Sequence, residues 1–431
     1  MVDVRKFKLG EIAKIYNGST PSTLDSSNYD GDIIWATPKD LSDQNSKYFS
    51  QGARNITQKG FDSCSTQMIP ANNILMSSRA PIGLFAINTV DCCTNQGFKN
   101  IVLDKSIADV DFMYYLLKYH IKEIEALGSG TTFREVSKST FEKYEISIPS
   151  LSTQQKIASV LSDIDRKIFV NREINRNLEE LAKQIYDYWF VQFDFPNEEG
   201  KPYKSSGGKM VYNEILKREI PAWWEVKKIS SQIKENIGGD WGKEEPEGNY
   251  QLKVSCCRGA DIVSMTDLPT RYILNANSSK LLEEGDMVVE ISGGSPTQAT
   301  GRCVLISKEF LNSFDNKLIC SNFCQALSIL DKDYVSYFYH MWKMFYDSDI
   351  FFNFEGKTSG IKNFQYDTFV AEKWYFPPKE LSKKSGEIVS QNYKKKCALD
   401  QENKHLTALR NSLLPLLMNG QVTLNSCLSL K

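Results

Sequence analysis

The chain repeats its own sequence pattern at a separation of 228 residues. Gly128 aligns with Gly356 at that separation, and the matches that follow need no gap. In each copy a Gly/Ser/Thr-rich segment leads into a Thr-Phe pair, then a β-branched and aromatic run ending in proline, then a long helical pattern. The further matched pairs are Thr140 and Thr368, Phe141 and Phe369, Pro149 and Pro377, Leu178 and Leu406, and Ile185 and Leu413. Such a repeat indicates a duplicated domain with its own connecting helix, and two similar units usually bind something that has two similar ends.

Each copy mixes strand and helix patterns. In the first copy, short β-branched runs at 32–35 and 73–76 alternate with Gly, Pro and Asn turns, and an aromatic helical stretch covers 112–127. The second copy, from about Pro221 to Pro377, repeats this outline. The patterns predict two α/β (α+β) domains in tandem.

A heptad pattern follows the first copy. Ser152 to Gln155 has the form of a capping box, which predicts a helix start, and the helical pattern continues to Phe193. At 1.5 Å per residue this helix would be roughly 60 Å long, too long to pack inside one small domain. Its four-three spaced seam, in which the asparagines reduce stability but fix register, consists of Ile157, Leu161, Ile164, Ile168, Asn171, Asn175, Leu178, Ala182, Ile185 and Trp189.

A second helix is expected from about Ser382 to Met418, with Asn419-Gly420 as its stop and a bend at Pro415. The shift of 228 transfers the seam to Val389, Asn392, Lys396, Leu399, Asn403, Leu406, Arg410, Leu413 and Leu417. Because the first helix delivers the chain to the second copy, the second helix can return along it only in the antiparallel direction. We therefore expect a pseudo-twofold molecule whose two domains are separated by an antiparallel two-helix coiled coil. Two unrelated amphipathic helices, each packed on its own domain, are the alternative.

These patterns divide the chain into six segments. Between the first helix and the second copy, a polar and turn-rich passage containing Gly207-Gly208 has the composition of a linker. The expected segments are a first domain at 1–150, a first helix at 151–195, a linker at 196–220, a second domain at 221–378, a second helix at 379–420 and a tail at 421–431.

Charge and hydropathy restrict the function. The net charge is -1 and the pI is about 6.4, whereas a protein that binds DNA unaided usually has a basic excess. Any nucleic-acid role must therefore be local or shared with a partner. The sequence has no run of about 18 apolar residues and begins with alternating charge, which predicts a soluble cytoplasmic protein without a membrane span.

No metal site is predicted. The ten cysteines include two adjacent pairs but no CxxC motif, and their spacing matches no zinc template. We interpret them as reduced structural thiols. The three histidines, His120, His340 and His405, are far apart in the sequence and suit packing or surface roles.

Several motifs resemble one known family. Gly31 to Leu41, preceded by Asn17 to Pro21, resembles the opening of a target recognition domain in the specificity subunits of type I restriction-modification systems. Gln154 to Asp165 is similar to the start of that family's spacer helix. Further similar segments are Gly128 to Phe133, Ile146 to Pro149, and Ile220 to Val226. The resemblance covers essentially the whole chain, although Trp35 to Asp40 has no clear counterpart in the second copy, where Val254 to Arg258 comes nearest.

The resemblance implies a subunit that recognises a split sequence in double-stranded DNA, each domain binding one half while the helices set the gap. It also implies partners: two DNA-methyltransferase subunits that use S-adenosylmethionine, and restriction/translocase subunits that use ATP and magnesium. No cofactor is expected in this chain, which would act in antiviral defence in bacterial or archaeal cytoplasm. Two dyad-related domains suit duplex DNA, because half-sites on opposite strands are related by the same symmetry.

Catalytic motifs are missing from the sequence. Adenine methylation calls for an NPPY-like or DPPY-like segment, and Asp194 to Pro196 lacks the second proline and the tyrosine. Gly293 to Gly301 is glycine-rich but has no GK[ST]. Asp286 and Glu290 lack the lysine of a nuclease ExK motif. We therefore predict a non-catalytic recognition subunit with no catalytic residues.

Candidate DNA-contacting residues are polar, expected on loops and long enough to reach bases or phosphates. An arginine such as Arg79 or Arg134 can form two bonds to guanine, and Gln298 or Asn363 can do so to adenine. In the first copy the candidates are Thr37, Lys39, Ser77, Ser78, Arg79, Thr131, Thr132, Arg134 and Lys138. In the second copy they are Ser292, Ser295, Thr297, Gln298, Arg302, Lys357, Thr358, Lys362, Asn363 and Gln365.

Three alternatives remain open at this point. One is a specificity subunit of another defence or modification assembly. Another is a coiled-coil adaptor that binds proteins and not DNA. The third is an enzyme with an unrecognised site, which would require turnover by the purified chain alone.

Overall fold

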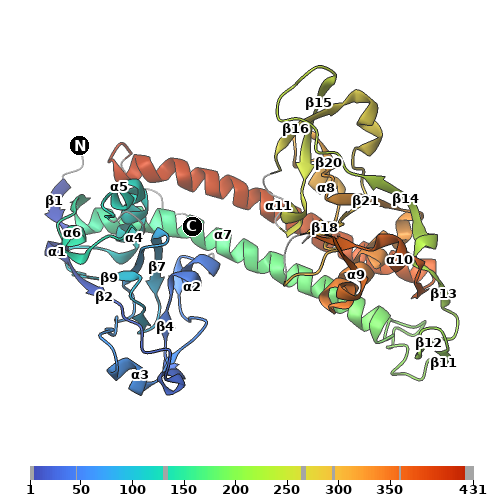
Figure 1. Ribbon diagram of the computed structural model, residues 1–431, viewed down its shortest axis with the longest axis horizontal. Coiled ribbons are helices and arrows are strands. Elements are labelled where there is room, and N and C mark those ends of the chain that lie inside the picture. The colour runs from blue at the N-terminus through green and yellow to red at the C-terminus, as the bar shows by residue number, and fades with distance from the viewer. Residues whose placement is uncertain are drawn as a thin grey trace. The chain divides into compact units, whose positions relative to one another are not determined.

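The structure, a computed structural model, describes residues 4–44, 46–129, 134–263, 268–293, 297–358 and 361–422, without the side chains of Val263, Lys357 and Thr358. The chain forms two compact units. Unit 1 comprises Met1–Val170 with Glu402–Lys431, and unit 2 comprises Asn171–Gln401. Each of two long helices contributes one part to each unit (Figure 1).

A five-stranded sheet forms the centre of unit 1, in the order β2-β9-β6-β7-β5. All of its strand pairs are antiparallel except β5 with β7. All five residues of β6 are buried, so this strand lies inside the unit. The bounds are β2 Ala13–Asn17, β5 Tyr48–Phe49, β6 Ile74–Ser78, β7 Ile82–Asn88 and β9 Phe98–Leu103.

Helix α4 and its neighbours enclose the core of unit 1. Seven of the ten residues of α4 are buried, as its aromatic sequence predicts, and they pack with the sheet and with the first turns of α7. The other helices are α1 Leu9–Ile12, α2 Pro38–Asp43, α3 Gln58–Asp62, α4 Val110–Tyr119, α5 Ile121–Ala126, α6 Lys138–Glu142 and the 3-10 turn η1 Ser26–Asn28. The remaining strands are β1 Val4–Lys8, β3 Tyr29–Ile33, β4 Trp35–Ala36, β8 Cys93–Thr94 and β10 Glu145–Pro149.

Unit 2 repeats this topology. Its four-stranded sheet has the order β14-β21-β17-β19, which corresponds to β2-β9-β6-β7. The antiparallel pair β13-β24 corresponds to β1-β10, and the parallel pair β15-β20 corresponds to β4-β8. The predicted duplication is therefore confirmed as a duplication of fold, with mixed α/β content in both copies.

Unit 2 also has strands and turns that have no counterpart in unit 1. The strands of the unit are β11 Met210–Asn213, β12 Arg218–Pro221, β13 Glu225–Lys228, β14 Ile233–Gly238, β15 Tyr250–Cys257, β16 Thr270–Leu274, β17 Met287–Glu290, β18 Ser292–Gly293, β19 Cys303–Leu305, β20 Lys317–Cys320, β21 Cys324–Ile329, β22 Glu355–Thr358, β23 Ile361–Phe364 and β24 Lys373–Phe376. Its helices are α8 Lys308–Leu311, α9 Val335–Asp347 and α10 Tyr366–Ala371, with 3-10 turns η3 Ile229–Gln232, η4 Gly259–Val263, η5 Asn275–Lys280, η6 Lys332–Tyr334 and η7 Ile350–Phe354.

The segment expected to be a linker is folded. Strands β11 and β12 pair as an antiparallel hairpin, and the Phe195 ring stacks on Tyr203 with centroids 4.7 Å apart. The indole nitrogen of Trp223 donates to the Tyr203 hydroxyl over 3.1 Å. Aromatic packing, which turn residues such as Gly207-Gly208 did not reveal, therefore fixes this passage within unit 2.

The long helices have nearly the predicted extents. Helix α7 covers Leu151–Tyr186 and continues as a π-helical turn, Asp187–Val191, and α11 covers Lys379–Met418. The capping box at Ser152 is wrong, because the helix already begins at Leu151. The side-chain amide of Gln154 donates to the carbonyls of Ile107 and Pro149 at 3.0 and 2.9 Å, so it binds the start of α7 to the domain that precedes it. Helix α11 continues through Pro415.

The two helices run antiparallel within each unit. In unit 1, Arg410 pairs with Asp165 at 2.6 Å and Lys167 with Glu402 at 3.3 Å. In unit 2, Asn175 donates to Asp400 over 2.7 Å and Lys396 pairs with Glu179 at 3.0 Å. One residue number rises as its partner's falls, which only antiparallel helices allow. The alternative of two independently packed helices is therefore wrong.

The predicted seam positions face the packed side of both helices. On α7 and its π-helical turn, all ten are buried or half-buried, with Leu161 and Asn171 fully covered. On α11, Val389 and Leu417 are buried and the other seven are half-buried. Lys396 and Arg410, which are poor seam residues by their type, lie at the seam because each has a carboxylate partner on α7.

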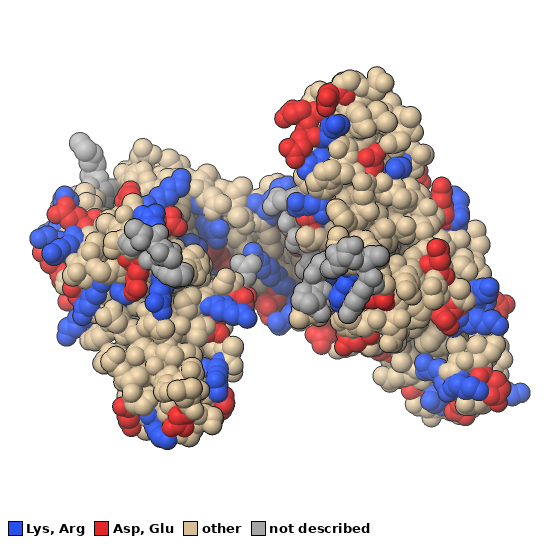
Figure 2. Space-filling model, in the orientation of Figure 1, with Lys and Arg blue, Asp and Glu red and all other residues tan. Residues whose placement is uncertain are grey.

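Surface charge follows the balanced composition. On the face shown in Figure 2, basic and acidic side chains are interspersed over both units.

Most cysteines in the described ranges are buried, and burial raises the pKa of Cys92 and of Cys256 to about 12, so these thiols remain protonated. None of the helices in the described part of the chain has both the length and the apolar character needed to cross a membrane.

Candidate nucleic-acid interface

In unit 1, two polar segments meet beside the central sheet. Ser129 and Glu135 form an isolated antiparallel bridge, and the amide of Val136 donates to the Ser78 carbonyl over 3.1 Å. Ser78 ends β6, so the segment after α5 lies against the turn that joins β6 to β7. Residues 78–81 thereby lie beside Ser129 and residues 134–136, although about 50 residues of sequence separate them.

An ion pair with a buried lysine holds this junction. The ammonium group of Lys99, on β9, lies 2.9 Å from the Glu135 carboxylate and donates to the Ser78 hydroxyl over 3.3 Å. The Lys99 side chain is 6% exposed, whereas Glu135 is 38% exposed. Arg79 reaches the other Glu135 oxygen at 4.0 Å. One carboxylate therefore joins β9, the end of β6 and the segment after α5.

The candidate residues of unit 1 differ in their exposure. Lys39, Arg134 and Lys138 are exposed and Arg79 is half-buried, so these cations can reach a ligand. The hydroxyl of Thr37 is used in the cap of α2, where it donates to Asp40 over 2.6 Å. Thr131 and Thr132 lie outside the described residues.

Two serines of unit 1 do not have the expected exposure. Ser77 and Ser78 lie on β6 and are fully buried. Ser77 donates to the Pro81 carbonyl over 2.7 Å and accepts from the Leu84 amide over 2.8 Å. Both hydroxyls therefore stabilise the turn from inside and do not reach a base edge.

Arg134 is partly occupied by its own domain. Its guanidinium donates to the carbonyls of Glu125 and Gly128 over 3.2 to 3.3 Å, at the C-terminal end of α5. Cations are favoured at that end of a helix because its carbonyls lack partners. The side chain is nevertheless exposed, so its remaining N–H groups face solvent.

In unit 2, a bidentate ion pair joins the end of β17 to the residue that follows the glycine-rich segment. Arg302 donates to both oxygens of Glu290 at 2.8 and 2.7 Å. The two side chains are 19% and 7% exposed. Arg302 was expected to contact DNA, but it lies inside the fold, where its planar guanidinium matches the carboxylate. Glu290 is consequently an ion-pair partner and not half of a nuclease site.

A second ion pair binds the same glycine-rich segment. Lys362, on β23, pairs with Glu355 of β22 at 3.0 Å, with side chains 12% and 6% exposed. The ammonium also donates to the Gln298 carbonyl over 3.2 Å, and Glu355 accepts from the Thr300 amide over 2.8 Å. Lys362 is thus an internal residue and not the exposed cation that was expected.

The other candidates of unit 2 lie on β18 and β23 and in the segments next to these strands. Ser292 on β18 is paired with Asn363 on β23, and its hydroxyl donates to the Asn363 side chain over 2.5 Å. Thr297, Gln298 and Gln365 are exposed. Ser295 lies outside the described residues, as do the side chains of Lys357 and Thr358.

The sequence analysis missed Lys99, Glu135, Thr300 and Glu355. A signal was available for Lys99, because a lysine inside the apolar run 98–103 is expected to have a buried acidic partner. Glu135 and Glu355 flank Gly/Thr-rich segments, but only the fold shows that their carboxylates point inward.

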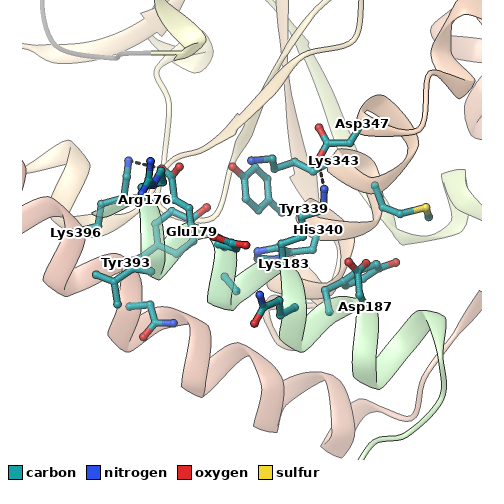
Figure 3. Close-up of a pocket in the computed structure, with 17 residues that line it drawn as sticks. Arg176, Glu179, Lys183, Asp187, Tyr339, His340, Lys343, Asp347, Tyr393 and Lys396 are labelled. Carbon is teal, nitrogen blue, oxygen red and sulfur yellow. Dashed lines mark hydrogen bonds and ion pairs between the residues drawn. The ribbon is translucent and has the colours of Figure 1, made fainter. Parts of the chain in front are cut away.

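A cavity of about 540 Å³ in unit 2 lies among α7, α9 and α11 (Figure 3). The ion pair of Lys183 and Asp347, 3.2 Å long, lies on its wall, and His340 is buried beside it. Its charged lining residues balance: Arg176, Lys183, Lys343 and Lys396 against Glu179, Glu180, Asp187 and Asp347. This balance favours no ligand charge.

Catalytic and metal-binding constellations have little support in the part of the chain that the structure describes. Asp286 accepts from the Ser328 hydroxyl over 2.5 Å, and burial raises its pKa. No group of three or more His, Cys, Asp or Glu side chains is placed to hold a metal among these residues. The fold defines a class of protein with two domains of one repeated topology and two paired long helices.

Comparison with known proteins identifies the family. The type I restriction modification DNA specificity domain matches residues 1–180. The MjaIX specificity subunit of a Methanocaldococcus jannaschii type I restriction enzyme is 30% identical over 436 residues, covering 97% of this chain and 93% of that protein. The Escherichia coli EcoR124I/EcoR124II specificity subunit is 28% identical over 203 residues, covering 44% and 48%. The chain belongs to the family of type I restriction enzyme specificity subunits, which are recognition and not catalytic subunits.

A solved structure agrees with the fold. The S subunit of a type I restriction-modification system from M. genitalium matches with a TM-score of 0.58, covering 96% of each chain at 18% identity. At that identity the likeness concerns the fold alone, and it extends over both copies of the duplicated domain.

Proposed function

We propose that this specificity subunit recognises a bipartite sequence in double-stranded DNA, with unit 1 and unit 2 each binding one half. The observation that carries the proposal is the repeated topology, β2-β9-β6-β7 in one unit and β14-β21-β17-β19 in the other. Two copies of one domain present the same kind of surface twice, and a duplex offers two half-sites on opposite strands.

The contact surfaces are the polar segments at corresponding ends of the two sheets. In unit 1 the accessible residues are Arg79, Arg134 and Lys138. Lys39, on the helix α2 that follows β4, is accessible as well. In unit 2 they are Thr297, Gln298, Asn363 and Gln365. Arginine suits guanine and phosphate, while amide side chains suit adenine, so the two units are expected to prefer different half-sites. Thr131, Thr132, Ser295, Lys357 and Thr358 remain candidates from the sequence.

Binding is shared with partner subunits. A net charge of -1 and interspersed surface charges give the chain weak general attraction for phosphates. Two DNA-methyltransferase subunits carrying S-adenosylmethionine would supply the remaining contacts and the chemistry. Restriction/translocase subunits would supply ATP- and magnesium-dependent functions. The helices α7 and α11 would set the length of unread DNA between the half-sites.

A binding titration tests the shared model. The chain alone, its methyltransferase partner alone, and the two together are titrated with duplex DNA that carries the target, at two salt concentrations. We expect weak binding by the chain alone and tight, sequence-dependent binding by the complex. Equally tight binding by the bare chain would contradict shared binding, and a complex without sequence preference would contradict the DNA role and favour the protein-binding adaptor.

A further inference from the structure

We propose that the pairs Lys99–Glu135 and Lys362–Glu355, in each of which the lysine is buried, are positioning residues that set the DNA selectivity of unit 1 and unit 2 separately. This inference rests on the proposed function, and it assigns roles to residues that need not contact DNA. Each pair lies within one unit. Lys99 and Glu135 are themselves distant in sequence, whereas Lys362 and Glu355, on neighbouring strands, together bind the distant residues Gln298 and Thr300. The pairs therefore act on the shape of a recognition surface and not on its composition.

In unit 1 the pair fixes three segments through one carboxylate. Glu135 binds Lys99 at 2.9 Å, accepts from the Ser78 hydroxyl at 3.5 Å and faces Arg79 at 4.0 Å. Its backbone is bridged to Ser129. Loss of the Glu135 charge would leave the Lys99 ammonium buried without its carboxylate, so the junction between residues 78–79 and Glu135 would have to rearrange.

In unit 2 a different pair makes an equivalent connection. Lys362 and Glu355 bridge β23 to β22, and both also hold the glycine-rich segment, through the Gln298 carbonyl and the Thr300 amide. The Lys362 ammonium lies 4.8 Å from the centre of the Phe352 ring, which adds a cation–π contact. The segment that bears Gln298 therefore depends on this pair for its position.

The two pairs are not related by the sequence repeat. At a separation of 228, Glu135 corresponds to Asn363 and Lys99 to Leu327, so neither partner of the first pair recurs. Both units nevertheless use a buried lysine and a glutamate to join the turn after the inner strand, β6 or β17, to the segment after α5 or η7. The recurrence of the connection with different residues indicates that the connection itself is required.

Burial of the two lysines restricts the geometry of these pairs. A buried lysine that is paired with one carboxylate tolerates few alternative arrangements, because any other position leaves its charge unsatisfied. A recognition group must be held to within about half an ångström to discriminate between bases. Exposed pairs elsewhere in the same units lack this constraint and serve as matched controls.

The test uses the full complex with its methyltransferase partner and four variants. Glu135→Gln and Glu355→Gln remove one charge while keeping side-chain size. Glu145→Gln and Glu247→Gln are the controls, because Lys6–Glu145 and Lys243–Glu247 are exposed pairs, the second of them 3.6 Å long. Binding is measured to the intact target and to targets with one or the other half-site scrambled, and thermal unfolding verifies that each variant folds.

We expect E135Q to reduce discrimination at one half-site and E355Q at the other, each by about tenfold, the effect of one lost charge-assisted hydrogen bond. Both controls should keep the selectivity of the unaltered complex. Should E135Q fail to fold, Glu135→Asp, which keeps the charge on a shorter side chain, replaces it with the same direction of effect expected. Unchanged discrimination in folded variants, or equal loss at both half-sites, would overturn the proposal. An unaltered complex that ignores both half-sites would instead refute the proposed function.

Discussion

Acidification should destabilise unit 2 through one buried histidine. His340 lies on α9, is 8% exposed, and donates from Nδ1 to the Ser336 carbonyl over 2.8 Å. Its ring stacks on Tyr186 of α7 with centroids 6.1 Å apart. Burial, with a smaller effect of the nearby Lys343 charge, lowers the pKa of His340 from 6.5 to about 4. The histidine therefore reports on the packing of α9 against α7.

The sign and size of the effect follow from linkage. The unfolded chain binds a proton at His340 near pH 6.5, whereas the folded chain does so only near pH 4. The stability contribution is therefore complete above pH 6.5 and is lost as the pH falls toward 4. The pKa difference corresponds to about 3.4 kcal/mol in total, of which about 2 kcal/mol is lost by pH 5. Asp187, whose pKa is raised by burial beside the same cavity, has the opposite dependence, so the histidine must be isolated by substitution.

Urea unfolding at pH 7.5 and pH 5 measures the effect. Six of the seven tryptophans lie in unit 2, among them Trp342 on α9, so their fluorescence follows this unit. Between the two pH values the unaltered chain should lose about 2 kcal/mol more than the His340→Asn variant, which keeps a donor for Ser336. His405→Gln, at an exposed position, should match the unaltered chain. Equal pH dependence in the His340→Asn variant and the unaltered chain would refute the assignment.

Three further predictions concern the paired helices. Leu161→Ala, at a fully buried seam position, should reduce the free energy of unfolding of unit 1 by about 2 to 5 kcal/mol in a denaturant titration, whereas Phe169→Ala, at a position 54% exposed, should change it by less than about 0.5 kcal/mol. Asn175→Ala removes the 2.7 Å bond to Asp400 and should reduce the stability of unit 2 by about 1 to 3 kcal/mol, and an unchanged denaturation midpoint would show that the bond contributes nothing. Insertion of one heptad into both helices should lengthen the gap that the complex accepts between half-sites, as measured with targets of graded spacing; an unchanged optimum would mean that the helices do not set it.

The long helices could be predicted from sequence because their signal is periodic. The heptad spacing from Ile157 to Trp189 identifies the packed face without knowledge of the partner, and chain direction then requires an antiparallel return. The helix start was less predictable. Gln154 satisfies carbonyls of its own domain, at Ile107 and Pro149, and no local pattern distinguishes that role from a cap.

The site was predicted less completely, because exposure is a property of the fold. Ser77 and Arg302 have the residue types of DNA-contacting groups, yet one is bonded within a turn and the other within an ion pair. Polar residue type and nearby glycines cannot distinguish a side chain that points outward from one that points inward. Lys99 was overlooked for the converse reason, since the apolar run around it indicated a strand and its function depends on a glutamate 36 positions away.

The central claim is that one chain recognises two separated stretches of duplex DNA through two copies of one domain. Mapping methylated adenines in cells that carry this subunit and its methyltransferase partner tests it most directly. The account predicts one recurrent target in which two short defined sequences flank a gap of fixed length, with a methylated adenine in each half on opposite strands. A single uninterrupted target, or methylation without a fixed gap, would contradict it.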